Sequence, residues 1–129
     1  MVLLITEADR SPEDIDDSVD RSIIGQSSLL LYADLDGLKE INDTFGHSEG
    51  SLAIAKTAEV LRQTFRNSDI VSRLGGDEFA ILAQNVPRHK VENITARLEE
   101  NLCRENKQNK HCYQLSLRVG AVWIAHDAI

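Results

Sequence analysis

The chain is 129 residues long, and its 14 Lys and Arg against 21 Asp and Glu give a formal charge of −7. This length and a hydrophobic content of 42% predict one compact domain and exclude a disordered or collagen-like chain. The longest apolar runs, Met1–Ile5 and Leu29–Ala33, are far shorter than the ~20 residues of a membrane span. The acidic balance also argues against a broad surface for binding DNA or RNA.

The N-terminus and the cysteines predict a cytoplasmic protein. Met1–Ile5 is too short for the apolar part of a signal peptide, and Glu7 and Asp9 follow it closely. Cys103 and Cys112 have a spacing that fits no zinc or redox motif, so we expect reduced thiols.

The first half of the chain predicts two helices and a strand. Ser11 as a cap and Pro12 at the first helical position predict a helix over residues 12–24. The continuous apolar run that follows predicts a strand over residues 27–34, covered on both faces. Apolar residues at steps of three and four then predict a helix over residues 51–65.

The second half predicts a hairpin, a helix and a last strand. Two short β-prone runs, residues 69–74 and 79–83, are joined by Gly75-Gly76-Asp77, which is typical of a tight hairpin. Helical spacing of apolar residues predicts a helix over residues 91–102, and strict alternation predicts a strand over residues 113–124. This order of elements predicts an α+β fold whose sheet contains antiparallel pairs, with helices on one or both faces.

Acidic pairs occur at two of the predicted strand ends. Asp34 and Asp36 leave the same face of an extended chain, and Asp77 and Glu78 follow the hairpin glycines. Mg²⁺ commonly combines one or two carboxylates with substrate phosphates, whereas either pair alone is also explained by a solvated turn. If both strand ends converge, only a cation makes the concentrated negative charge tolerable. Lys39 is placed to approach a phosphate.

Two longer motifs resemble those of a known family. Residues 32–50 read YADLDGLKEINDTFGHSEG, and residues 73–79 read RLGGDEF. Together they resemble the GGDEF family of diguanylate cyclases, over roughly residues 27–124. The resemblance implies the nucleotidyl-cyclase palm, a ferredoxin-like fold with a mostly antiparallel sheet flanked by helices. It also implies a reaction, dependent on Mg²⁺ or Mn²⁺, that joins two GTP molecules into cyclic di-GMP and releases two pyrophosphates.

The resemblance implies roles for the acidic residues. Asp34 and Asp77 would bind metal through their side chains and Leu35 through its backbone carbonyl, while Asp36 would support the site. Two ions would activate the 3′-hydroxyl of one GTP and neutralise the triphosphate of another. Glu78 would help to deprotonate that hydroxyl or bind the second ion, so Asp77 and Glu78 are the expected catalytic residues.

The resemblance also implies the contacts to GTP. Backbone amides of Gly37, Leu38 and Lys39 would hold the β- and γ-phosphates. Asn42 would hydrogen-bond the edge of the guanine base. Ser51 stands where the family usually has an Asp that grips guanine, so we expect base binding to weaken by about 1–3 kcal/mol.

The resemblance also implies a product-inhibition site and a homodimer. Arg66-Asn-Ser-Asp69 matches the RxxD product-inhibition site of the family, where Arg66 would grip a product phosphate or guanine edge and Asp69 would accept from guanine. Away from that context, the same string is typical of an ion pair at a helix end. Because each palm holds one GTP, ring closure is expected to require a homodimer.

We expect residues 1–129 to form a single GGDEF domain. The chain shows neither the D-x-L-T-G-L-x-N-R signature with which family members open nor their final helix, whose basic residues contact the triphosphate. This suggests a domain attached to sensory or signalling domains in a longer protein. Two functions stay open: an active diguanylate cyclase, and a degenerate module that binds GTP or cyclic di-GMP to regulate a partner, which Ser51 favours.

Overall fold

A computed structural model describes residues 1–8, 27–109 and 113–125 of the chain. Its strands are β1 (Val2–Ala8), β2 (Ser28–Leu35), β3 (Ile70–Gly75), β4 (Glu78–Gln84) and β5 (Leu117–Ile124). Its helices are α2 (Leu38–Phe45), α3 (His47–Thr64) and α4 (Val91–Gln108), the last preceded by a single 3₁₀ turn (Arg88–Lys90). The helix predicted over residues 12–24 lies outside the described residues.

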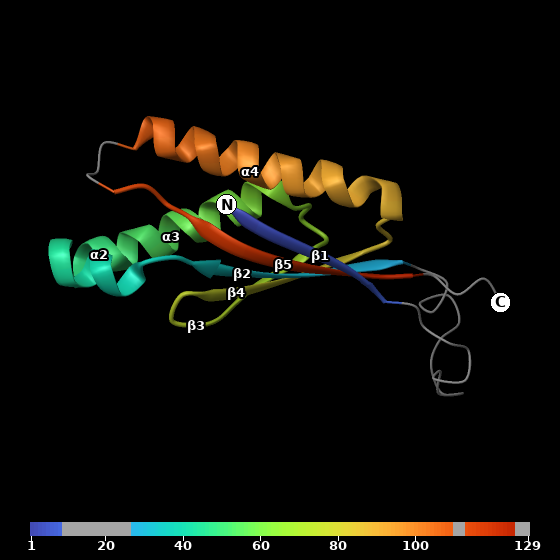
Figure 1. Ribbon diagram of the computed structural model, residues 1–129, viewed down its shortest axis with the longest axis horizontal. Helices are drawn as coiled ribbons and strands as arrows, with labels where there is room; N and C mark the ends of the chain where they lie inside the picture. The colour runs from blue at the N-terminus through green and yellow to red at the C-terminus, as the bar shows by residue number, and fades with distance from the viewer. Residues whose placement is uncertain (9–26, 110–112, 126–129) are drawn as a thin grey trace.

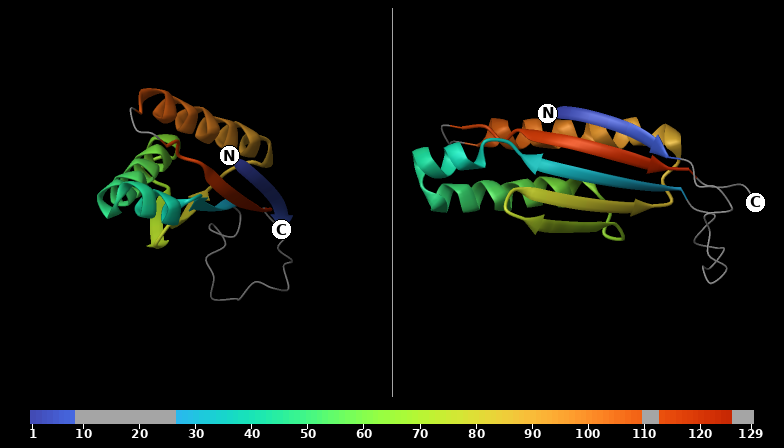
Figure 2. Two further views of the ribbon diagram at one scale, coloured as in Figure 1. Left: turned by 60° about the vertical axis from the view of Figure 1, so that its left-hand side comes forward. Right: turned by 60° about the horizontal axis from the view of Figure 1, so that its bottom comes forward.

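The described strands form one five-stranded sheet in the order β1-β5-β2-β4-β3 (Figure 2). The pairs β5–β2, β2–β4 and β4–β3 are antiparallel, and only β1 pairs parallel, with β5. Helices α3 and α4 lie side by side on one face of this sheet (Figure 1). The predicted ferredoxin-like palm, with its mostly antiparallel sheet flanked by helices, is therefore confirmed.

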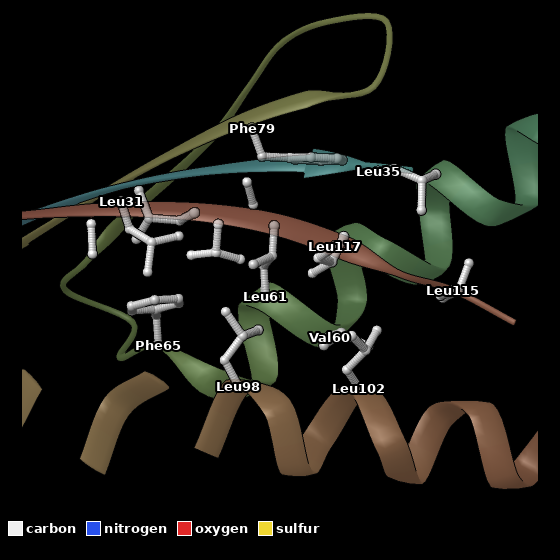
Figure 3. Packing of buried hydrophobic residues seen from close by; sticks show 14 of the residues in the cluster. Leu31, Leu35, Val60, Leu61, Phe65, Phe79, Leu98, Leu102, Leu115 and Leu117 are labelled. Atoms are coloured by element: carbon white, nitrogen blue, oxygen red, sulfur yellow. The ribbon is translucent and has the colours of Figure 1, made fainter. Parts of the chain in front are cut away.

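The core lies between the sheet and the two long helices. Inward-facing residues of the strands, such as Leu31 and Leu117, meet Leu61 of α3 and Leu98 of α4, and all four are completely buried (Figure 3). The continuous apolar run in β2 predicted a strand covered on both faces. That prediction is wrong for the described residues, because burial alternates along β2 and Tyr32 is 48% exposed.

Two elements were not predicted, and one strand is shorter than expected. Strand β1 and helix α2 are additional elements, and α3 begins at His47 rather than at residue 51. Strand β5 begins at Leu117 rather than at residue 113. The reason is that the Asn106 side chain donates to the Leu115 carbonyl (2.9 Å) and accepts from the Leu115 N–H (2.8 Å), which replaces strand pairing there.

Among the residues that the structure describes, no helix combines the length and the apolar character required to cross a bilayer.

Candidate nucleotide and metal site

The two acidic strand ends meet in the structure. Because β2 and β4 are antiparallel, the end of β2 lies beside the start of β4, and Asp34 is the register partner of Glu78. The Leu35 N–H donates to the Asp77 carbonyl at 2.9 Å, which fixes the hairpin tip against the end of β2. The convergence expected from the sequence is therefore present.

The hairpin tip is also held by a side chain that the motif analysis did not single out. Gly75 and Gly76 have φ values of 150° and 50°, in the region that side chains rarely adopt. The Arg73 guanidinium donates to the Gly76 carbonyl from Nε (3.0 Å) and from Nη2 (2.8 Å). Arg73 therefore stabilises the turn that presents Asp77.

Asp34 is in an electrostatically unfavourable position. Its Oδ1 atom is buried and has no hydrogen-bond partner. Burial raises the pKa of Asp34 above its ordinary value of 3.8, and the Asp77 carboxylate raises it further through its charge and a side-chain hydrogen bond. The charges of Glu78 and Asp36 add to this effect. An orphaned oxygen among several carboxylates is the environment that a bound cation would stabilise.

The donor set fits Mg²⁺ or Mn²⁺ only if a substrate completes the coordination. Among residues 1–8, 27–109 and 113–125, no three His, Cys, Asp or Glu side chains are arranged as a metal-binding group. The site instead offers Asp34, Asp77 and the backbone of Leu35. Mg²⁺ usually keeps several waters and combines one or two carboxylates with phosphate oxygens, so this smaller set suffices.

A loop suited to phosphate binding follows directly. Gly37 has a left-handed φ of 73° and turns the chain from β2 into α2, where its carbonyl accepts from the Ile41 N–H at 3.0 Å. The first N–H groups of a helix have no partner within the helix, and those of Leu38 and Lys39 belong to this set. The loop therefore offers backbone donors for a phosphate close to the acidic pair.

Helices α2 and α3 bring the two expected base-binding positions together. A Cβ atom added to Gly50 would lie 1.7 Å from Asn42 Oδ1 and 2.7 Å from Asn42 Cγ. The Asn42 carboxamide therefore packs directly against the backbone of α3, beside the exposed Ser51. Gly50 is a position that sequence reasoning missed, and its occurrence in the GHSEG stretch was the available signal.

Comparison with known proteins shows to which family the chain belongs. A family model described as "Diguanylate cyclase, GGDEF domain" matches residues 12–128. The chain belongs to the GGDEF family. It is 42% identical over 78 residues to the probable diguanylate cyclase DgcJ of Escherichia coli, and 36% identical over 95 residues to the probable diguanylate cyclase DgcC of the same organism. These matches cover 60% and 74% of the chain but only 16% and 26% of the two relatives.

A solved structure supports the same conclusion. The GGDEF domain of the Pseudomonas aeruginosa protein YfiN, also called TpbB, is 30% identical to this chain, with a TM-score of 0.66. The similarity covers 76% of this chain and 62% of that one. The fold and the family of the chain are thus established.

Gly50→Ala tests the packing of Asn42 in this GGDEF domain. We expect the variant to bind GTP about tenfold more weakly, because the new methyl group forces the Asn42 carboxamide away from α3. Isothermal titration calorimetry with GTP would measure the loss. Helix propensity alone would favour Ala over Gly by about 1 kcal/mol, so lower affinity without loss of fold would point to the displaced side chain. Ser48→Ala in the same turn is the matched control, and equal affinities for GTP would contradict the expectation.

The RxxD residues form a separate site at the other end of β4. Arg66 Nη2 lies 2.9 Å from Asp69 Oδ1 and also donates to the Gln84 carbonyl at 2.7 Å. The Asp69 carboxylate is almost buried, with 4% of its side chain exposed. Gln84 ends the strand that Glu78 begins, so the structure places this pair about 20 Å from the acidic site.

A cavity of about 280 Å³ adjoins this ion pair. Arg66 and Asp69 line it together with Lys90 and Arg97, two cations that motif analysis did not identify. Arg97 reaches it from α4 and donates to the Thr64 carbonyl at 3.5 Å. The sequence does not reveal this grouping, because it depends on how α4 packs against α3. The cavity combines three cations with one carboxylate, which suits an anionic ligand that also carries hydrogen-bond donors.

Proposed function

We propose that this GGDEF domain is a diguanylate cyclase that condenses two GTP molecules into cyclic di-GMP. The observation that carries the proposal is the buried, unpartnered Oδ1 of Asp34 against the Asp77 carboxyl group. Such an arrangement favours a divalent cation, and the phosphate-binding loop begins three residues after Asp34. The relatives named probable diguanylate cyclases support the same activity.

The reaction assigns a task to each part of the site. Asp34, Asp77 and the Leu35 carbonyl would hold Mg²⁺ or Mn²⁺, which when bound would polarise the α-phosphate and favour ionisation of the 3′-hydroxyl. Amides of residues 37–39 would hold the β- and γ-phosphates and orient pyrophosphate as the leaving group. Oxygen O3′ of one GTP would form a bond to the α-phosphorus of the other GTP as the bond from that phosphorus to pyrophosphate breaks. The exposed Glu78 would accept the proton from O3′.

The assembly follows from the chemistry of the product. One phosphate loop and one acidic pair serve one GTP, so a cyclic product needs two domains that face each other as a homodimer. The named relatives are several times longer than the matched region, which supports a domain attached to sensory or signalling domains. We propose a cytoplasmic location, where GTP is available as the substrate.

A turnover assay tests this function. The chain, joined to a parallel coiled coil that enforces dimers, would be incubated with GTP and Mg²⁺. We expect cyclic di-GMP and pyrophosphate in a ratio of one to two, and no product after chelation of the metal. The unfused chain should show turnover that rises with protein concentration more steeply than linearly. Absence of product from the enforced dimer would contradict the proposed activity.

The cavity beside Arg66 supports a second function, the binding of cyclic di-GMP as a regulatory ligand. Its three cations face a small space that also contains the Asp69 carboxylate. This arrangement could bind product phosphates and accept from a guanine edge. If Ser51 lowers GTP affinity enough to prevent turnover, this would be the remaining function of the domain.

Arg66→Ala is expected to weaken cyclic di-GMP binding about 10- to 100-fold, the effect of losing charge-assisted hydrogen bonds. Calorimetry with cyclic di-GMP would measure the change. Arg62→Ala removes another exposed cation, from the last turn of α3, and serves as the control. Unchanged affinity in the Arg66 variant would rule out this site, and binding without turnover in the preceding assay would favour the regulatory module over the cyclase.

A further inference from the structure

Arg118 lies on the face of the sheet opposite to α3 and α4. It is the register partner of Asp34 across β5 and β2, and Asp34 is in turn the partner of Glu78 across β2 and β4. Register partners point to the same side of a sheet, so Glu78, Asp34 and Arg118 form one row across three strands. Arg118 therefore lies at one end of a row that contains the carboxylates of Asp34 and Glu78.

The Arg118 side chain is held only loosely. Its Nε lies 4.0 Å from Asp36 Oδ1, and 70% of its side chain is exposed. Asp36 is fixed independently, because its Oδ2 accepts from Ser116 Oγ at 3.2 Å and its N–H donates to the Ser116 carbonyl at 2.8 Å. An exposed pair at this distance contributes little to stability, so the guanidinium can change partners at small cost.

A cavity of about 540 Å³ opens on this face of the sheet. Arg118 is the one basic residue that lines it in the described part of the chain, beside Asp34 and Glu78. Most of the remaining lining is apolar and includes Tyr32 and Leu74. Arg118 therefore faces the same space as the carboxylates of Asp34 and Glu78.

We propose that Arg118 binds the polyphosphate of the nucleotide, a contact that rests on the proposed function of the site. The phosphate loop begins at Gly37, directly after Asp36, and the guanidinium already approaches Asp36 to 4.0 Å. A phosphate on the amides of residues 37–39 would lie close to a planar group whose donors match phosphate oxygens.

A cation at this place has one alternative role, that of a counter-ion that occupies the metal position. The geometry argues against this role. Arg118 pairs with the supporting Asp36, and no ion pair joins it to Asp34 or Asp77 in the described residues. The Asp34 Oδ1 atom keeps no hydrogen-bond partner in its presence. The guanidinium thus leaves the metal position free.

Calorimetry can test this contact without turnover. The ligands are a GTP analogue with a methylene bridge between the α- and β-phosphorus atoms, and GMP, both with Mg²⁺. Arg118→Ala should weaken binding of the triphosphate analogue at least tenfold and change GMP binding less than twofold. Arg118→Lys should recover part of the loss. Arg62→Ala, which removes the same charge at the far end of α3, should bind both ligands as the unmodified chain does.

The outcomes separate this proposal from the function on which it rests. If the unmodified chain binds neither ligand, the nucleotide site itself is wrong and the Arg118 contact falls with it. If it binds the analogue and Arg118→Ala binds equally well or more tightly, only the Arg118 contact is overturned. Equal weakening for the analogue and GMP would also overturn it, because it would show a general disturbance of the site.

Discussion

Asp34→Asn is expected to abolish turnover and to stabilise the metal-free protein. Loss of the carboxylate proposed to hold the metal should lower the rate at least ~1,000-fold, which corresponds to about 4 kcal/mol of transition-state stabilisation. At the same time the substitution removes a partly buried charge that Asp77, Glu78 and Asp36 all disfavour. The amide can also donate to the Asp77 carboxylate. A higher melting temperature in chelator and absence of cyclic di-GMP should therefore occur together.

The stability gain should depend on pH in a defined direction. The folded-state pKa of Asp34 lies above its ordinary value of 3.8, so folding favours the protonated carboxyl group. The contribution of this group to stability is therefore complete below about pH 3.8 and is lost as pH rises through the raised pKa. Asp34→Asn lacks this loss. The difference in stability between the variant and the unmodified chain should therefore grow as pH rises across that window and then level off.

Thermal denaturation in chelator, repeated from about pH 3.5 to pH 7, would measure the effect. Asp43→Asn is the matched control, because Asp43 is an exposed carboxylate on α2. Addition of Mg²⁺ with the GTP analogue should stabilise the unmodified chain and leave Asp34→Asn unchanged. A lower melting temperature for Asp34→Asn would contradict the electrostatic destabilisation at this position, and preserved turnover would show that Asp34 does not hold the catalytic cation.

Phe79→Ala should cause the largest loss of stability among changes within the GGDEF motif. Phe79 is 2% exposed and belongs to the cluster of buried hydrophobic residues that forms the core (Figure 3). Replacing a buried Phe by Ala typically costs about 3–5 kcal/mol, through lost apolar burial and the cavity that remains. Urea denaturation followed by circular dichroism should show a lower midpoint with an unchanged slope.

Leu74→Ala provides the comparison for Phe79→Ala. Leu74 lies in the neighbouring strand of the same hairpin, but it is 56% exposed. We expect its replacement to cost less than about 1 kcal/mol, because exposed substitutions seldom change stability by more. Similar losses for both variants would show that the hairpin, rather than burial, determines the effect. The last residue of the motif thus belongs to the core, whereas the two before it lie at the candidate site.

The sequence was sufficient for elements whose apolar pattern is long or whose turn is unambiguous. Alternation along β5 and the stripe on α4 predicted which residues are buried, and the two glycines predicted the hairpin. Helix α2 was missed because it is only eight residues long, so Leu38, Ile41 and Phe45 form too short an apolar stripe to stand out, and only Ile41 is buried. Strand β1 was missed because its partner, β5, lies more than one hundred residues further along the chain.

The site, like the fold, could be predicted only in part from the sequence. The meeting of Asp34 and Asp77 was predictable, because a strand end and a hairpin tip are brought together by a simple antiparallel pairing. The close packing of Asn42 on Gly50 and the approach of Arg118 to Asp36 were not, since both depend on distances between elements that carry no local pattern. Motif reasoning located the acidic residues, and only tertiary packing shows the groups that position or neutralise them.

The bond from Arg73 to the Gly76 carbonyl has a consequence for ligand binding. Two glycines in succession would leave the loop with high conformational entropy, and a ligand that needed one conformation would have to supply the ordering free energy itself. The guanidinium restricts that freedom when the chain folds. Association at the hairpin should therefore proceed with little rearrangement of the loop, at a rate set by diffusion and charge.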